Sequence, residues 1–136
     1  MLSAGSTGYA FNRTRQTYLA TGLSTARTHW SRLRGLMGVD PKDFPAGRGL
    51  WIVPSHGVHS FGMRFAIDVV YLDENQTVVY AVHALRPWRV APVSRRAASV
   101  LELPGDTLQA TKTSIGDAIE ISTTKMAEAG STWQTS

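Results

Sequence analysis

Short apolar segments separated by turn-forming residues set the strongest limit on how this chain can fold. From residue 49 onwards, runs rich in Val, Ile, Leu and Tyr end at turn clusters such as 54–57, 73–76 and 104–106. Runs of this length suit β-strands, whose commonest length is about five or six residues. Short strands joined by turns are typical of a β-sandwich or a partly closed barrel. Strands do not alternate with long helices, so we do not expect a Rossmann-like fold.

The pattern predicts a mainly β chain of about eight short strands with one short α-helix. The expected strands are 8–12, 17–21, 49–53, 59–63, 67–72, 77–83, 99–103 and 118–122. One or two further helical turns are expected within 107–114. The chain has 136 residues, the length of one domain. We place that domain at residues 1–122, followed by a polar C-terminal tail at 123–136.

The helix is expected at residues 24–37. Ser24 or Thr25 can cap it, because a side-chain oxygen at this position accepts a free N–H of the first turn. The larger apolar side chains of this stretch recur at helical spacing and would form one buried stripe. These residues are Ala26, Trp30, Leu33 and Met37. Gly38 favours a left-handed end to the helix.

Composition excludes several classes of protein and of site. Apolar residues make up 43% and charged residues 18%, which is typical of a globular domain. The absence of cysteine excludes disulfides, thiol nucleophiles and thiolate metal sites. No apolar run has the roughly 18 residues of a membrane span, and the first residues carry no signal-peptide pattern. We therefore expect a soluble, cytoplasmic protein.

Positive charge is concentrated in two parts of the chain. The net charge is +4, and 11 of the 14 basic residues are Arg. Residues 1–39 and 81–99 hold nine of these arginines and no acidic residue. A guanidinium binds carboxylate and phosphate with a planar fork, so an anionic partner is one interpretation and a solvated surface is the simpler one. The basic loop from Arg86 to Arg96 contains Trp88, so a nucleic-acid-binding module is an alternative, supported by a single stacking ring.

Residues 59–73, HSFGMRFAIDVVYLD, place two opposite charges inside an apolar stretch. On one straight strand, Arg64 and Asp68 would lie roughly 13 Å apart, at about 3.3 Å per residue, which is too far for a direct ion pair. A turn at 64–66 would bring them together and would let a new strand begin after it. Asp68 would then be partly buried and would need N–H donors or an arginine. We expect a structural clamp with Arg34 or Arg64 in preference to a catalytic acid.

The patterns for enzymatic chemistry are incomplete. A metal ion needs several ligands, and the candidates are His56, His59, His83 and Asp68. Residues three apart on a strand point to opposite faces, however, and the spacing marks no third ligand. Ser60 adjoins His59, but no Gly-x-Ser-x-Gly turn is present to expose a nucleophile. We expect no cofactor and no metal, and we keep a hydrolase or metal-dependent enzyme using His59 and Asp68 as the alternative.

Three ordered motifs resemble those of one family. They are SRLRGLMG at 31–38, HSFGMRFAIDVVYLD at 59–73 and VLELPGDTLQATKTSIGDAIEI at 100–121. In this order they resemble the bacterial and archaeal domain of unknown function family 192, over nearly the whole chain. The resemblance implies a small β-sandwich of jelly-roll type with little helix, and it brings no activity or ligand. Family members often carry a basic residue just after Gly-Leu-Met, where this chain has Gly38 and Val39.

Together these features favour a non-enzymatic protein that binds a small ligand or a protein partner. The unusual side chains fall near turns, and loops on a rigid scaffold commonly carry function. Mixed aromatic, Met and Arg content suits an anionic or partly apolar ligand, bound at one end of the sandwich. The candidate ligand-binding residues are Arg34, His59, Met63, Arg64, Asp68, Trp88 and Arg89.

Overall fold

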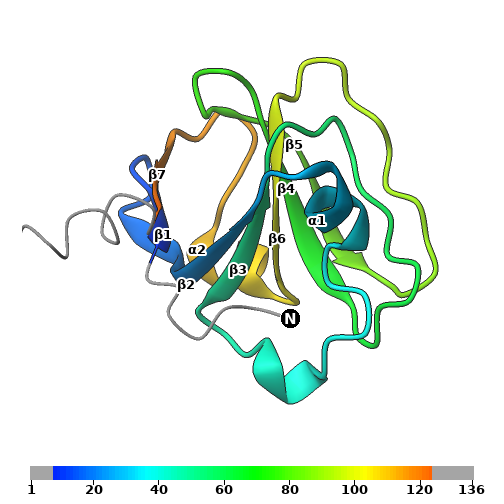
Figure 1. Ribbon diagram of the computed structural model, residues 1–136. Coiled ribbons are helices and arrows are strands. Elements are labelled where there is room, and N and C mark those ends of the chain that lie inside the picture. The colour runs from blue at the N-terminus through cyan, green and yellow to red at the C-terminus, as the bar shows by residue number, and fades with distance from the viewer. Residues whose placement is uncertain (1–7, 124–136) are drawn as a thin grey trace, which may run out of the picture.

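A computed structural model describes residues 8–123, and its main feature is one curled sheet of seven strands (Figure 1). The strands are β1 (Gly8–Asn12), β2 (Thr17–Ala26), β3 (Arg48–Ile52), β4 (Ile67–Leu72), β5 (Val78–Leu85), β6 (Ser99–Pro104) and β7 (Ile119–Ser122). The helices are α1 (His29–Arg34), the 3-10 helix η1 (Pro41–Asp43) and α2 (Thr107–Thr111). The mainly β prediction is confirmed, in the form of half a barrel. No helix in this part of the chain is long and apolar enough to cross a membrane.

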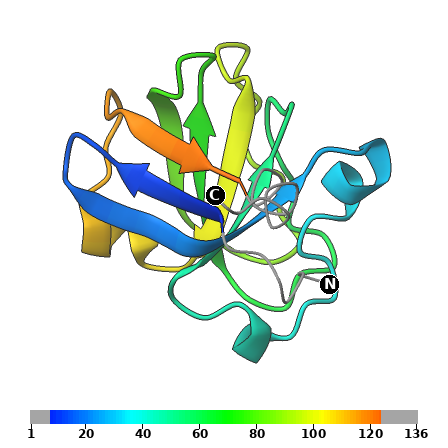
Figure 2. The same cartoon turned by 60° about the vertical axis from the view of Figure 1, so that its left-hand side comes forward.

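The two ends of the sheet approach each other. The strand order is β5-β4-β6-β3-β2-β1-β7, and neighbours are antiparallel except β2 and β3, which are parallel. Just before β5, Thr77 forms a bridge with Ala118, which precedes β7. The N–H of Val78 also donates to the Asp117 carbonyl at 2.9 Å. The sheet therefore curls and has an inner, concave face and an outer, convex face (Figure 2).

Apolar side chains cover both faces of the sheet. Successive side chains of a strand point to opposite sides, so a largely apolar strand contributes to both faces. On the inner face, Val70 and Leu101 belong to a buried cluster that includes Leu108 of α2, and we call this cluster the inner core. On the outer face, Val69 and Val100 belong to a second buried cluster, which we call the outer core. Its other members include Leu36, Phe44, Met63, Ala91 and Ala97, from the segments between strands. Long connecting segments therefore cover the outer face.

The prediction for the first helix is wrong in its start, in its end and in its buried face. Strand β2 continues to Ala26, because its last residues pair in parallel with β3, so Ser24 and Thr25 lie in a strand. Helix α1 begins later, where Thr28 forms a capping box with Ser31. The expected buried stripe is largely exposed, and no residue of α1 is buried.

The break that we predicted within 59–73 is confirmed, but the segment before it is not a strand. Strand β4 begins at Ile67, as expected. In the expected strand 59–63, only His59 forms a bridge, to Val90. The chain then turns at Gly62, whose φ of 76° suits glycine. Sheet pairing is therefore lost here, and the described sheet has seven strands. The expected tail falls almost entirely outside the described residues.

Candidate functional site

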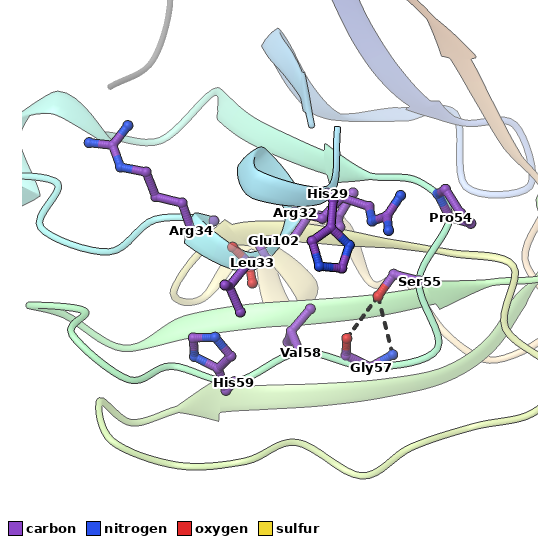
Figure 3. A pocket seen from close by; sticks show the side chains of 12 residues that line it. His29, Arg32, Leu33, Arg34, Pro54, Ser55, Gly57, Val58, His59 and Glu102 are labelled. Atoms are coloured by element: carbon purple, nitrogen blue, oxygen red, sulfur yellow. Dashed lines mark hydrogen bonds between the residues drawn. The ribbon is translucent and has the colours of Figure 1, made fainter. Parts of the chain in front are cut away.

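A pocket of about 260 Å³ opens on the outer side of the sheet, between α1, β6 and the segment after β3 (Figure 3). Helix α1 contributes His29, Arg32 and Arg34, and the segment after β3 contributes His59. Strand β6 contributes Glu102. The pocket therefore combines four basic side chains with one acidic side chain, from three elements that are distant in sequence.

Glu102 reaches this pocket because of its place in β6. Leu101 and Leu103 on either side of it belong to the inner core, so the alternation of a strand directs Glu102 to the outer face. Its neighbours across the ladder are Leu50 and Val69, both in the outer core. The strand therefore carries an acidic side chain into apolar surroundings.

The side chain of Glu102 is buried, and one of its carboxyl oxygens has no partner within residues 8–123. The residue is 1% exposed, and Oε1 has no hydrogen-bond partner among the described residues. Burial raises the pKa of Glu102 to about 8. A Cβ placed on Gly35 would lie 3.5 Å from Oε1, so the carboxyl lies close against the end of α1. At neutral pH the group is mostly protonated, and a neutral carboxyl can donate one hydrogen bond and accept others.

The basic side chains at the rim make few contacts with the protein. Arg32 Nη1 donates to the Arg27 carbonyl at 3.2 Å. Within residues 8–123, the side chain of Arg34 has no hydrogen bond and no ion pair, and Figure 3 shows its guanidinium extending away from Glu102. The Nδ1 atom of His59 accepts the N–H of Phe61 at 3.1 Å. Arg34 is therefore exposed and free to change its rotamer.

An apolar groove of about 560 Å³ adjoins the pocket, and we call it the aromatic groove. Its apolar side chains are Trp30, Leu33, Met37 and Phe61. Three residues line both the pocket and the groove, namely Leu33, Arg34 and His59. The Phe61 ring stacks on His59 at 5.1 Å and on Trp88 at 6.0 Å between ring centroids. The pocket and the groove therefore lie next to each other and share part of their walls.

The structure brings together some of the predicted site residues and separates others. Arg34 and His59 meet at the pocket, and Trp88 is joined to them through Phe61. Met63 is 4% exposed and belongs to the outer core, because the chain turns inward after Gly62. Met63 therefore lines neither the pocket nor the groove.

The predicted clamp between Asp68 and an arginine is wrong. Asp68 Oδ1 accepts the N–H of Ala84 at 2.9 Å, and Oδ2 accepts the N–H of Leu108 at 2.8 Å. Arg64 instead lies 3.6 Å from Asp40. Backbone amides replace the arginine because Asp68 faces inward, opposite Leu103 of the inner core. Asp68 is a structural acid that joins β4 to β5 and to α2.

His59 and Asp68 lie on opposite sides of the sheet, so they do not form the predicted alternative enzyme site. The other histidines also have separate contacts. His56 Nδ1 lies 2.7 Å from the Ala97 carbonyl, and His83 lies 3.5 Å from Asp106. In the part of the chain that the structure describes, no group of three or more His, Asp or Glu side chains is placed to hold a metal ion.

The basic loop is held by a buried serine. Ser60 Oγ donates to the Arg86 carbonyl at 2.5 Å and accepts the N–H of Arg89 at 2.8 Å. The side chains of Arg86, Trp88 and Arg89 are exposed. Ser60 is therefore a structural residue, and Arg89 lies beside Trp88 at the edge of the aromatic groove.

Sequence reasoning did not single out Glu102. The available signal was a lone acidic residue within the apolar strand VLELP, the same kind of signal that singled out Asp68 in IDVVYL. The two acids differ in whether hydrogen-bond donors reach them. The donors that reach Asp68 come from other elements of the fold.

Comparisons with known proteins give relatives that are themselves uncharacterised. The UPF0127 proteins of Pyrococcus abyssi and Pyrococcus furiosus are 40% and 38% identical to this chain over 63 residues. That stretch is 46% of this chain and 53% of each relative. The match thus spans about half the length of these curated relatives.

Two crystal structures resemble this fold. A protein of unknown function from Novosphingobium aromaticivorans has a TM-score of 0.70 at 16% identity, covering 83% of this chain and 82% of that chain. A proposed transcription regulator from Sinorhizobium meliloti 1021 has a TM-score of 0.71 at 19% identity, covering 89% and 97%. At these identities the likeness shows the fold alone.

A sequence profile of one family matches nearly the whole described chain. The family is domain of unknown function 192, described as "Uncharacterized ACR", and its profile matches residues 10–121. The match contains all of the structural segments that form the pocket, from α1 to β6. The chain therefore belongs to the domain of unknown function 192 family.

Proposed function

We propose that this protein is a binding protein, and that it holds a small ligand in the Glu102 pocket without converting it chemically. One observation carries the proposal, namely the buried carboxyl oxygen Oε1 of Glu102, which has no partner among the described residues and belongs to a side chain that lines the pocket. A buried polar group without a partner costs about 1–3 kcal/mol, so such groups are commonly retained for a role beyond stability. A ligand that hydrogen-bonds to this carboxyl would remove that cost.

The charge around the pocket favours a neutral or anionic ligand. Arg32 and Arg34 at the rim repel cations, and the chain as a whole carries a net charge of +4. A protonated Glu102 can donate its hydrogen bond to an oxygen of the ligand, and the guanidinium groups can balance a negative charge. A small carboxylate fits this combination best.

Binding is favoured over catalysis because the nearby hydroxyl groups already have partners. The hydroxyl of Ser55 donates to the Gly57 carbonyl at 2.7 Å, within the turn that forms one wall. The hydroxyl of Ser60 is bonded to the basic loop. A nucleophile needs a base within hydrogen-bond reach, and neither serine is paired with a histidine or an acid in the hydrogen bonds described for residues 8–123.

Titration of the ¹⁵N-labelled protein with acetate, phosphate or acetamide tests the proposal by NMR. We expect acetate to shift the amide signals of Leu33 and Gly35, which line the pocket. The variant Glu102→Leu, which has a similar volume and no polar group, should lose this response. The control Ile115→Glu changes an exposed residue outside the pocket and should keep it. If none of the three probes shifts these amides, or if Glu102→Leu responds like the wild type, the proposal fails.

A second candidate function, binding of single-stranded nucleic acid, is favoured by the exposed stack of Phe61 on Trp88 beside Arg89. Bases stack on exposed rings, and arginine contacts phosphate. Fluorescence anisotropy with a labelled oligothymidine across a salt series tests this candidate. A steep loss of affinity with salt that Trp88→Ala abolishes would support it, and weak binding without salt dependence would exclude it.

A further inference from the structure

We propose that the ligand is a single-chain amphiphile, with a carboxylate head in the Glu102 pocket and an alkyl chain in the aromatic groove. This inference rests on the proposed function and deepens it by naming the class of ligand. Its basis is that an arginine-rimmed pocket with Glu102 in its wall lies next to an apolar groove and shares three lining residues with it.

The junction between the two sites suits such a ligand. Leu33, Arg34 and His59 line both of them. A ligand can therefore extend from one site into the other while remaining in contact with the protein. Arg34 stands at this junction and has no ion pair within residues 8–123, so its guanidinium is available to a carboxylate.

The walls of the groove are apolar side chains that lie open to solvent. Trp30 is 68% exposed and Leu33 is 52% exposed, and both belong to α1, which has no buried residue. A contiguous exposed apolar surface commonly marks a binding site. Met37 forms part of the groove, and the unbranched side chain of methionine adapts to ligands of irregular shape. Each methylene buried here would raise affinity about fourfold.

The head of the ligand meets a mixed set of charges. Arg32, Arg34 and His29 face it from α1, and His59 faces it from the segment after β3. Glu102 faces it from β6 and lies at the base of the pocket. The chemistry of a head bonded to a protonated acid is the same for a free amphiphile and for a lipid in a bilayer. We favour the free amphiphile. Glu102 is only 1% exposed, so a lipid headgroup would have to leave the bilayer surface to reach it.

A chain-length series tests the inference. Straight-chain carboxylates from acetate to decanoate are titrated below their micelle concentrations, with binding followed by calorimetry. We expect affinity to rise about fourfold for each methylene that enters the groove, until the groove is full. Trp30→Ser and Met37→Ser, at two residues that line the groove and not the pocket, should flatten this rise and leave acetate binding unchanged. Ile115→Glu, an equally exposed control elsewhere, should leave the whole series unchanged.

The outcomes separate the two proposals. If acetate and decanoate bind equally and both are lost in Glu102→Leu, the amphiphile is excluded and the proposed function stands. If decanoate binds and Glu102→Leu does not weaken it, the assigned position of the head is wrong. If no carboxylate binds, both proposals fail. Binding to vesicles of anionic phospholipid is measured as well. A protein that binds the vesicles but not monomeric decanoate would overturn the inference in favour of a membrane surface.

Discussion

Two buried acids on neighbouring strands differ in what surrounds them. Asp68 of β4 faces the inner side of the sheet and accepts two backbone N–H groups, from Ala84 and Leu108. Glu102 of β6 faces the outer side and has an oxygen without any partner in the described chain. Both acids interrupt an apolar strand in the sequence. The comparison shows that partners, rather than burial, separate a structural acid from a candidate site residue.

A third buried acid supports this distinction. Asp117 Oδ2 accepts hydrogen bonds from Asn12 Nδ2 at 2.9 Å, from Arg15 Nε at 3.0 Å and from the N–H of Ser114 at 2.9 Å. Burial raises the pKa of Asp117, but these hydrogen bonds outweigh it and hold the pKa below its ordinary value. Asp117 therefore belongs with Asp68 as a structural acid.

The largest expected effect is that of Asp68→Ala. The change leaves the N–H of Leu108 buried without an acceptor and removes the acceptor of the partly buried N–H of Ala84, so we expect the free energy of unfolding to fall by about 3 kcal/mol. Urea denaturation followed by circular dichroism measures this loss. Asp68→Asn keeps one good acceptor and should lose less. If Asp68→Ala were as stable as the wild type, Asp68 would not be a structural acid, and its contrast with Glu102 would be lost.

Glu102→Leu should raise the free energy of unfolding, whereas Asp68→Ala lowers it. Removing an unpaired buried carboxyl while keeping its volume should stabilise the free protein by about 2 kcal/mol at pH 7. The pKa of Glu102 is higher in the folded protein, about 8, than in the unfolded chain, 4.5. The wild-type protein is therefore most stable with respect to this group below pH 4.5, and it loses that stability as the pH rises towards 8. The gain from Glu102→Leu should therefore shrink at pH 4. Denaturation at both pH values checks this, and a destabilised Glu102→Leu would mean that Glu102 is structural.

Asp117→Asn should cost about 1 kcal/mol, because the amide keeps one acceptor but loses the charge that pairs with Arg15. The depressed pKa of Asp117 gives a stability contribution that is present above the unfolded pKa, near 4, and is lost as the pH falls through the folded pKa. Thermal unfolding between pH 2 and pH 7 should therefore show a shallower acid dependence for Asp117→Asn. Equal acid dependence in the two proteins would show that this carboxylate is not linked to folding.

Arg64→Ala should have the smallest effect, below about 0.5 kcal/mol. The ion pair with Asp40 is long and both side chains are substantially exposed. Urea denaturation of Arg64→Ala and Asp68→Ala in parallel compares their losses in the free energy of unfolding. A loss as large as that of Asp68→Ala would restore the arginine clamp that the sequence suggested.

The sequence predicted those parts of the fold that local patterns determine. The ends of β4 and the turns of α2 follow from apolar runs and turn residues close to them in the chain. The first helix was misplaced because the pairing of β2 with β3 is a long-range contact that no local pattern records. Trp30 and Leu33 do lie on α1, but with Met37, which follows the helix, they form the exposed wall of a groove and not a buried stripe.

The site was predictable only in part for the same reason. Arg34 and His59 were expected to meet because the unusual side chains fall near turns. The partners of Asp68 are 16 and 40 residues away in sequence, and the absence of a partner for Glu102 depends on how α1 lies over β6. A buried acid can be recognised in the sequence, but whether donors reach it is decided by the packing of distant elements.

The titration of Glu102 tests the central claim most directly. The ¹³C signal of its side-chain carboxyl, followed by NMR from pH 3 to pH 10 and assigned with Glu102→Gln, reports the pKa of this one group. We predict a pKa of about 8 in the free protein, because burial without a partner disfavours the charge. A pKa near the ordinary value of 4.5 would show that solvent or a donor already satisfies the carboxyl, and it would contradict the account.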